Sequence, residues 1–116
     1  MKNYVSAKLH DVIVTDKSIE YRGSVSICAK LMQAAGIDPY ERVQVVNLTT
    51  GARWETYALP APPGQFTLNG GGARLGEVGD RCVVMTYVWD DIYRGANVVF
   101  CDQHNAIRDT MRYEGA

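Results

Sequence analysis

The chain has 116 residues, enough for one domain built around one core. Hydrophobic residues make up 47% and charged residues 22%, as in ordinary soluble globular proteins. A formal net charge of −1 excludes general electrostatic attraction to nucleic acid or to an anionic membrane. No apolar run approaches the roughly 20 residues that span a bilayer, and the segment from Met1 to Tyr4 alternates like a strand instead of opening a signal peptide.

The cysteines and histidines provide no recognisable disulfide or metal pattern. Cys28, Cys82 and Cys101 are an odd number without paired spacing. They predict buried, reduced thiols in a cytoplasmic protein. His10 and His104 are far apart, and no ligand spacing links either to a carboxylate or thiol cluster. We therefore expect no metal site.

Short β-rich runs broken by Gly, Pro and Asn dominate the chain. The predicted strands are residues 5–14, 18–27, 41–48, 53–59, 66–68, 82–88 and 97–101. A turn is expected at residues 15–17, and residues 49–52 are typical of a hairpin. Residues 29–35 predict a helix that ends at Gly36, with Pro39 just beyond. The tail from Ala106 is expected to be helical.

Proline and glycine mark the loops. Residues 60–64 predict a rigid loop, and residues 69–72, Asn-Gly-Gly-Gly, are expected to lie outside regular structure because glycine loses the most entropy on ordering. No internal repeat or linker divides the chain, so residues 1–116 form one predicted domain. Many short strands with one or two helices favour a small closed β-barrel, which removes exposed sheet edges.

The pair Gly23-Ser24 interrupts a β-branched run, where glycine normally weakens a strand. By itself it is most typical of a β-bulge or tight turn. A chemical alternative is an N-to-O acyl shift, in which the hydroxyl of Ser24 attacks the carbonyl of Gly23. The missing Cβ of Gly23 would leave that carbonyl open. The resulting ester can eliminate to dehydroalanine, which hydrolyses to an N-terminal pyruvoyl group.

Several other polar residues that could contribute to chemistry lie on or next to predicted strands. Strand alternation predicts that Lys8 and His10 share one face, and that Arg53 and Tyr57 share another. Taken singly, Lys8 and Arg53 are typical solvated strand charges, Tyr57 a barrel-wall aromatic and Asn69 a turn former. Their significance depends on their combination with Gly23-Ser24.

In order and approximate spacing, these segments resemble the aspartate 1-decarboxylase family. The matching segments are Lys8-Leu9-His10, Tyr21-x-Gly23-Ser24, Ala34-Ala35-Gly36-Ile37, Val46-Asn47-x-Thr49-x-Gly51, Arg53-x-x-Thr56-Tyr57, Leu68-Asn69-Gly70 and Val78-Gly79-Asp80. They cover most of residues 5–100. The combination is specific even though each of its parts is common.

The resemblance implies a proenzyme that cuts itself between Gly23 and Ser24. The products would be a β chain of residues 1–23 and an α chain of residues 24–116, whose pyruvoyl group derives from Ser24 and replaces both a metal and pyridoxal phosphate. The implied fold is mainly β, a six-stranded double-psi β-barrel with short helices. It would assemble as a homotetramer with active sites between subunits.

The resemblance also assigns roles. Ser24 would supply the pyruvoyl group that forms a Schiff base with the substrate amine, and Tyr57 would return a proton to the α-carbon. Arg53 and Lys8 would bind the two carboxylates of aspartate, for which the planar guanidinium is well suited. Thr56 would assist cutting at Gly23. Since alternation faces Thr56 away from Tyr57, a bulge or a neighbouring subunit is needed.

The remaining matches are supporting. Asn69 would help hold the site, with Gly70, Gly71 and Gly72 forming a wall beside the substrate. His10 and Tyr21 would have packing or supporting roles.

The chain also departs from the family pattern. Cys28 stands where an acidic residue is usual, Glu20 where histidine is common, and Arg22 where an acidic or apolar residue is common. Gly71 and Gly72 replace alanines, and the loop before Asn69 is shorter. We expect that the two missing methyl groups widen the range of small acidic substrates. The altered charges near the cut would slow processing or make it depend on a maturation factor.

Two functions follow from these residues. The first is an enzyme that decarboxylates L-aspartate to β-alanine and CO₂ for pantothenate and coenzyme A synthesis, without nucleic acid or membrane partners. The second is a non-processing double-psi barrel paralogue that binds a small molecule or a protein. The complete set of Lys8, Ser24, Arg53, Tyr57 and Asn69 favours the enzyme, because a structural barrel does not require all five.

Overall fold

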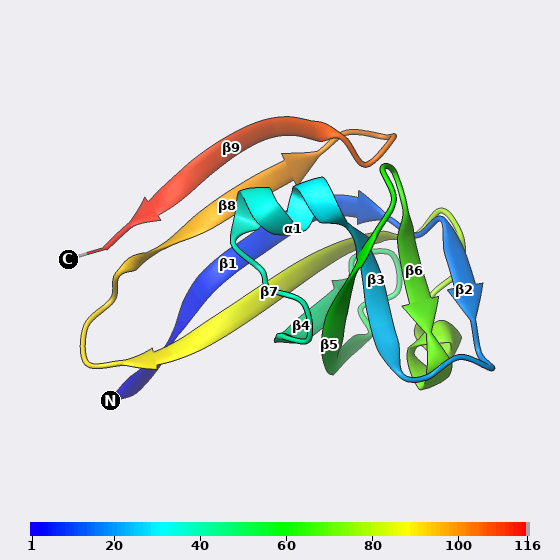
Figure 1. The fold of residues 1–116 in the computed structure, drawn as a ribbon, viewed down its shortest axis with the longest axis horizontal. Helices are drawn as coiled ribbons and strands as arrows, with labels where there is room; N and C mark the ends of the chain where they lie inside the picture. The colour runs from blue at the N-terminus through cyan, green and yellow to red at the C-terminus, as the bar shows by residue number, and fades with distance from the viewer. Residues whose placement is uncertain (116) are drawn as a thin grey trace.

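Alternating β-branched and polar residues place most of the chain in strands (Figure 1). The computed structural model describes residues 1–115. Its elements are β1 (Lys2–Ile13), β2 (Asp16–Ser18), β3 (Ser24–Cys28), α1 (Ala29–Ala35), β4 (Arg42–Asn47), β5 (Arg53–Ala61), β6 (Phe66–Asn69), the 3₁₀ helix η1 (Gly70–Leu75), β7 (Arg81–Asp90), β8 (Gly95–Cys101) and β9 (Ile107–Glu114). The mainly β class is therefore confirmed.

Nine strands within the described residues form one sheet in the order β2-β6-β3-β5-β4-β7-β1-β8-β9. Strands β2, β6, β3 and β5 lie at one end of the molecule, and β7, β1, β8 and β9 extend to the other, where both termini lie (Figure 1). Seven strands were predicted from the sequence, and the two further strands are β2 and β9. The sheet is not closed, which is compatible with the double-psi barrel that the resemblance implies.

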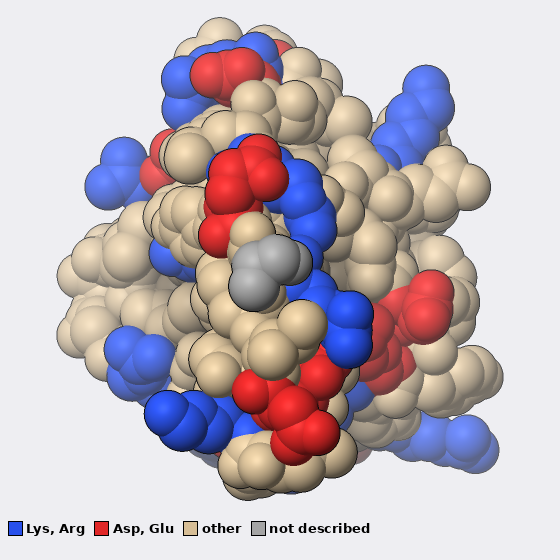
Figure 2. Space-filling model, turned by 90° about the vertical axis from the view of Figure 1, so that its left-hand side faces the viewer, with Lys and Arg blue, Asp and Glu red and all other residues tan. Residues whose placement is uncertain are grey.

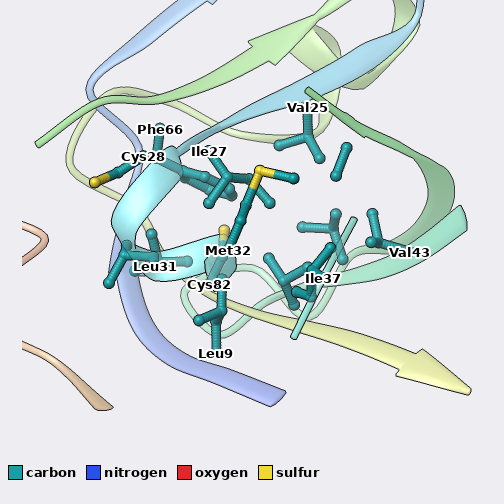
Figure 3. Close-up of a cluster of buried hydrophobic side chains, with 14 of the residues drawn as sticks. Leu9, Val25, Ile27, Cys28, Leu31, Met32, Ile37, Val43, Phe66 and Cys82 are labelled. Carbon is teal, nitrogen blue, oxygen red and sulfur yellow. The ribbon is translucent and has the colours of Figure 1, made fainter. Parts of the chain in front are cut away.

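The core lies where α1 packs between the two parts of the sheet (Figure 3). Leu31 and Met32 of α1 point from the helix into this cluster, and both are buried. Leu9 of β1, Ile27 of β3 and Phe66 of β6 are completely buried with them. Burial of such side chains stabilises a fold by about 1.5–3 kcal/mol each, so this cluster holds the two parts of the sheet together.

Helix α1 ends where the sequence predicts. Gly36 has φ +80°, and its N–H donates to the carbonyl oxygen of Gln33 at 3.2 Å. The N–H of Ile37 donates to the carbonyl oxygen of Met32 at 2.9 Å, which completes a Schellman motif. Ile37 is itself buried, so the cap also adds to the core.

The predicted hairpin at residues 49–52 joins β4 to β5, which pair antiparallel. The buried side chain of Asn47 organises it, because Oδ1 accepts hydrogen bonds from the N–H groups of Thr49 and Thr50. Nδ2 donates to a carboxylate oxygen of Asp80 at 2.9 Å. This hydrogen bond is the largest cause that lowers the pKa of Asp80 below its ordinary value. The hairpin prediction is confirmed.

The predicted turn at 15–17 is wrong, and the strand predicted at 18–27 is confirmed only from Ser24 onward. Residues Asp16–Ser18 form β2, which pairs in parallel with Thr67–Asn69 of β6. The chain then turns, with the N–H of Tyr21 donating to the carbonyl oxygen of Ser18 at 3.3 Å, and strand structure resumes only at Ser24. Charged and polar residues are tolerated in β2 because it is an exposed edge strand, so its composition resembles that of a turn.

The predicted helix from Ala106 is also wrong, because residues Ile107–Glu114 form β9, antiparallel to β8. Nearly every side chain of β9 is exposed, so its apolar residues follow neither the helical nor the strand period. Backbone pairing with the free edge of β8 decides its structure, and that edge is not visible in the local sequence. The glycine-rich stretch likewise differs from expectation, since Gly70 opens η1.

Asn105 ties together three segments that are distant in sequence. Its φ is +58°, a left-handed value that Asn tolerates better than most residues. Its Oδ1 accepts from the N–H of Ile13 at 2.8 Å, and its Nδ2 donates to the carbonyl oxygens of Ile13 at 2.9 Å and Gly64 at 3.0 Å. One buried amide thus fixes the end of β1 to the loop after β5.

The surface outside this core carries mixed charge. On the face in Figure 2, acidic and basic side chains are interspersed and separated by uncharged residues. Within residues 1–115, the helices are too short and too polar to cross a membrane.

We expect Asn105→Ala to lower the free energy of unfolding by about 3 kcal/mol, because three buried hydrogen bonds are lost and a strained φ is kept. Asn105→Gly should cost about 1 kcal/mol less, because glycine accepts the left-handed φ. Urea unfolding followed by circular dichroism measures both. Gln103→Ala, an exposed change in the same loop, is the control. Equal stability of Asn105→Ala and this control would show that the hydrogen bonds of Asn105 do not stabilise the fold.

Candidate functional site

Ser24 and Asn69 face each other across β3 and β6. They are a directly paired couple in the antiparallel register, and they are only 2% and 4% exposed. The amide Nδ2 of Asn69 donates to the hydroxyl oxygen of Ser24 at 3.0 Å and to that of Ser26 at the same distance. The hydroxyl of Ser24 lies 3.5 Å from the carbonyl oxygen of Arg22, to which it donates. A potential nucleophile is thus held in a buried polar setting.

Gly70 brings the start of η1 against the bond that precedes Ser24. Its φ is +62°, and a Cβ on it would lie 2.7 Å from the Cα of Gly23 and 2.8 Å from its nitrogen. Only glycine fits there without a shift of the backbone. On the other side Gly23 is open, because a Cβ added to it would meet no atom within 4 Å. The peptide group of Gly23 is therefore supported from one side and accessible from the other.

Tyr57 of β5 faces the same side of the sheet as Ser24. Val25 pairs with Ala58 in parallel register, and Ser24 and Tyr57 are the residues that precede this pair. Thr56 faces the opposite side. The pairing of β5 with β4 has no register shift around Thr56, so the structure places no bulge there. Within one protomer Thr56 and Tyr57 lie on opposite faces of β5. We therefore propose that Thr56 would assist cutting in a neighbouring subunit.

Lys8 and His10 lie on β1, which β7, β4 and β5 separate from β3. The ammonium of Lys8 donates to the hydroxyl of Tyr113 at 3.4 Å and lies 5.6 Å from the centre of that ring. The ring of His10 stacks on Phe100 at 5.1 Å. Burial lowers the pKa of His10, and the charge of Lys8 lowers it further. Both residues keep to one face as predicted, and three strands lie between them and Ser24 along the sheet.

Arg53 is exposed at the start of β5, where Gln44 of β4 orients it. The guanidinium donates to Oε1 of Gln44 at 3.0 Å, and the hydroxyl of Tyr87 donates to the same oxygen at 3.1 Å. Two donors on one oxygen hold the guanidinium on the outer face of the sheet. Arg53 and Tyr57 share this face, as the alternation predicts.

The remaining predicted residues are the two glycines after Gly70 and the tyrosine before the Gly23-Ser24 pair. A Cβ on Gly71 would meet open space, but one on Gly72 would lie 2.9 Å from the indole nitrogen of Trp54. Trp54 therefore fills the space of the methyl missing at Gly72, which weakens the expectation of a wider pocket at that position. Tyr21 is 53% exposed, and its carbonyl oxygen lies beside Gly70. Tyr21 contributes backbone to the cluster, with its ring largely in solvent.

Three residues in these contacts were not predicted from the sequence. Ser26 follows Ser24 at the strand period, so alternation was a usable signal for it. Gln44 pairs with Glu55 of the hairpin, but an isolated glutamine is not recognisable. Tyr113 belongs to β9, which was predicted as a helix, so no local signal could place it beside Lys8.

The three thiols are free and buried, as predicted. Burial raises the pKa of Cys82 and of Cys101 to about 12, so both stay protonated near neutral pH. Within the described residues, no three His, Cys, Asp or Glu side chains gather closely enough to hold a metal ion.

Comparison with known proteins gives one consistent result. The sequence profile of a family described as aspartate decarboxylase matches residues 1–108. An aspartate 1-decarboxylase of Acaryochloris marina is 45% identical over 112 residues, which cover 91% of this chain and 86% of that protein. The same named enzyme of Campylobacter jejuni is 42% identical over 115 residues, covering 95% and 91%. That of Pyrobaculum islandicum is 48% identical over 81 residues, covering 70% and 68%.

We expect Gly70→Ala to destabilise the chain by about 2 kcal/mol and to block cutting before Ser24, because the added Cβ overlaps the backbone of Gly23. Gly71→Ala is the matched control, since its Cβ meets open space one residue further on. Thermal unfolding and mass spectrometry of the purified chains measure the two effects. Normal cutting by Gly70→Ala would show that the close approach is unimportant.

Proposed function

This chain belongs to the aspartate decarboxylase family, and on that premise we propose that it converts L-aspartate to β-alanine and CO₂ with a pyruvoyl group made from Ser24. The observation that carries the proposal is the buried hydroxyl of Ser24, held by Asn69 next to the accessible Gly23. A serine that merely closed a turn would not require this setting. The alternative, a non-processing barrel that only binds, is less favoured because the named relatives are decarboxylases.

The proposed self-cleavage begins at the hydroxyl of Ser24. Its oxygen adds to the carbonyl carbon of Gly23, its proton passes to the amide nitrogen of Ser24, and the C–N bond breaks to leave an ester. Loss of the α-proton of Ser24 then breaks the Cβ–O bond, giving a Gly23 carboxylate and dehydroalanine. Water converts the dehydroalanine to pyruvoyl with release of ammonia. The N–H of Asn69, which donates to the serine oxygen, holds that oxygen in place for the attack.

The residues around Ser24 fit a pyruvoyl group at this position. The small strand residues and Gly70 leave Gly23 and its carbonyl approachable, and Asn69 supplies an N–H donor to the side chain of Ser24. Once formed, the group would supply an electrophilic carbonyl for the substrate amine and an electron sink for the decarboxylation. Tyr57, on the same face, is the proposed proton donor to the α-carbon.

Arg53 and Lys8 are the proposed carboxylate ligands. Each lies on the outer face, and Gln44 presents the guanidinium of Arg53 toward solvent. Because β7, β4 and β5 separate Lys8 from Ser24 in the sheet, we propose that neighbouring subunits of a homotetramer complete each site. The exposed side chains of Tyr87, Trp89 and Val88 on β7 are large and apolar, which favours a subunit contact there.

We also propose a cytoplasmic role in supplying β-alanine for pantothenate, in keeping with three free buried thiols. Small acidic amino acids other than aspartate remain candidate substrates. Gly71 faces open space, so the missing methyl at that position leaves room. A decarboxylation assay across amino acids decides this, and a reaction with aspartate alone would remove the wider range.

Intact mass spectrometry of the purified protein, before and after prolonged warming, tests the proposal. We expect a fragment of residues 1–23 and a fragment of residues 24–116 that is lighter than the serine form by one ammonia. Added aspartate should then yield β-alanine. If the chain stays whole alone and also with a candidate maturation factor, the decarboxylase proposal is wrong. Ser24→Ala, which has no hydroxyl, is the uncut control.

Tyr57→Phe tests the proton donor separately from processing. We expect normal cutting, a similar KM and a kcat at least about 100-fold lower, because only the phenolic proton is removed. Steady-state β-alanine formation per mole of α chain measures this. Tyr40→Phe is the matched control, because Tyr40 stacks on Tyr57 with ring centres 6.1 Å apart. A kcat reduced equally in both variants would contradict a specific role for the Tyr57 hydroxyl as proton donor.

A further inference from the structure

We propose that Ser26 is a positioning residue for self-cleavage, acting through Asn69 on the hydroxyl of Ser24. The inference deepens the proposed function and rests on it. Ser26 lies two residues after Ser24 on β3, so both hydroxyls point to the same side of the sheet. Asn69 stands opposite Ser24 on β6 and diagonal to Ser26. The three side chains form one connected hydrogen-bonded group.

The geometry assigns one N–H of the Asn69 amide to each serine. Nδ2 lies 3.0 Å from the oxygen of Ser24 and 3.0 Å from the oxygen of Ser26. An amide nitrogen carries two hydrogens, so both bonds can form at once. With both N–H groups engaged, the amide is held in a single orientation. Asn69 is 4% exposed, so water is a poor substitute for either acceptor.

The orientation of the nucleophile depends on this amide. The other contact of the Ser24 hydroxyl, to the carbonyl oxygen of Arg22, is long at 3.5 Å. The bond from Asn69 is the shorter of the two and fixes where the serine oxygen lies relative to the peptide of Gly23. Removing the Ser26 oxygen leaves one buried N–H without an acceptor. The amide can then rotate away, and its donation to Ser24 weakens.

The step affected is the attack on Gly23. In that step the Ser24 oxygen bonds to the carbonyl carbon, its proton moves to the Ser24 nitrogen and the C–N bond breaks. Correct placement of a nucleophile strongly influences the rate of such an intramolecular reaction. Ser26 itself neither gains nor loses a proton. Its effect should therefore appear in the rate of cutting while the fold is unchanged.

The test follows cutting from time zero in full-length chains made by cell-free synthesis, with the two fragments quantified by mass spectrometry. We expect Ser26→Ala to cut about tenfold more slowly than the wild type. Ser26→Thr, which restores the hydroxyl, should cut at close to the wild-type rate. Ser6→Ala is the matched control, since it removes a strand serine that hydrogen-bonds Thr86 at 2.7 Å, away from Asn69.

A double-mutant cycle separates positioning from general destabilisation. If Ser26 acts through Asn69, Ser26→Ala should cause no further slowing in an Asn69→Ala chain. Independent, multiplicative effects would overturn the inference, as would wild-type cutting by Ser26→Ala. The wild-type chain reports on the proposed function, because a wild-type chain that never cuts, alone or with a candidate maturation factor, refutes both. A wild-type chain that cuts beside an equally fast Ser26→Ala chain refutes only the role of Ser26.

Discussion

The antiparallel pairing of β3 with β6 is the constraint on which the candidate site depends. It sets Ser24 opposite Asn69, and the chain leaves β6 directly into η1, where Gly70 lies against Gly23. A shift of one residue in this register would turn Ser24 to the other face. The buried side chains of Ile27 and Phe66, which are paired in the same ladder, oppose such a shift because they would leave the core.

The side chains on the two faces of β3 therefore have different roles. Val25 and Ile27 face the core with Phe66 and the residues of α1, and they stabilise the fold. Ser24 and Ser26 face the other way and meet the amide of Asn69. The polar group lies at the edge of a well-packed core, which keeps its geometry rigid. Burial also strengthens its hydrogen bonds, because less water competes for them.

The cationic residues belong to a different part of the sheet. Lys8 rests against Tyr113 of the terminal strand, and Arg53 is held by Gln44. Neither cation is buried in an ion pair, so each stays available to an anionic group. The protomer thus separates the nucleophile from the proposed carboxylate ligands. Assembly of several protomers would combine them, in agreement with the exposed aromatic side chains of β7.

The amino-acid sequence was enough to predict the mainly β class, helix α1 with its Gly36 cap, the hairpin at residues 49–52, and the family through the spacing of its segments. These features depend on local periods and turn residues. Strands β2 and β9, the approach of Gly70 to Gly23 and the contact of Lys8 with Tyr113 became visible only in the folded chain. Each of these requires a partner distant in the chain, because edge strands pair through backbone groups that every residue carries. The composition of a segment therefore does not reveal which edge it joins.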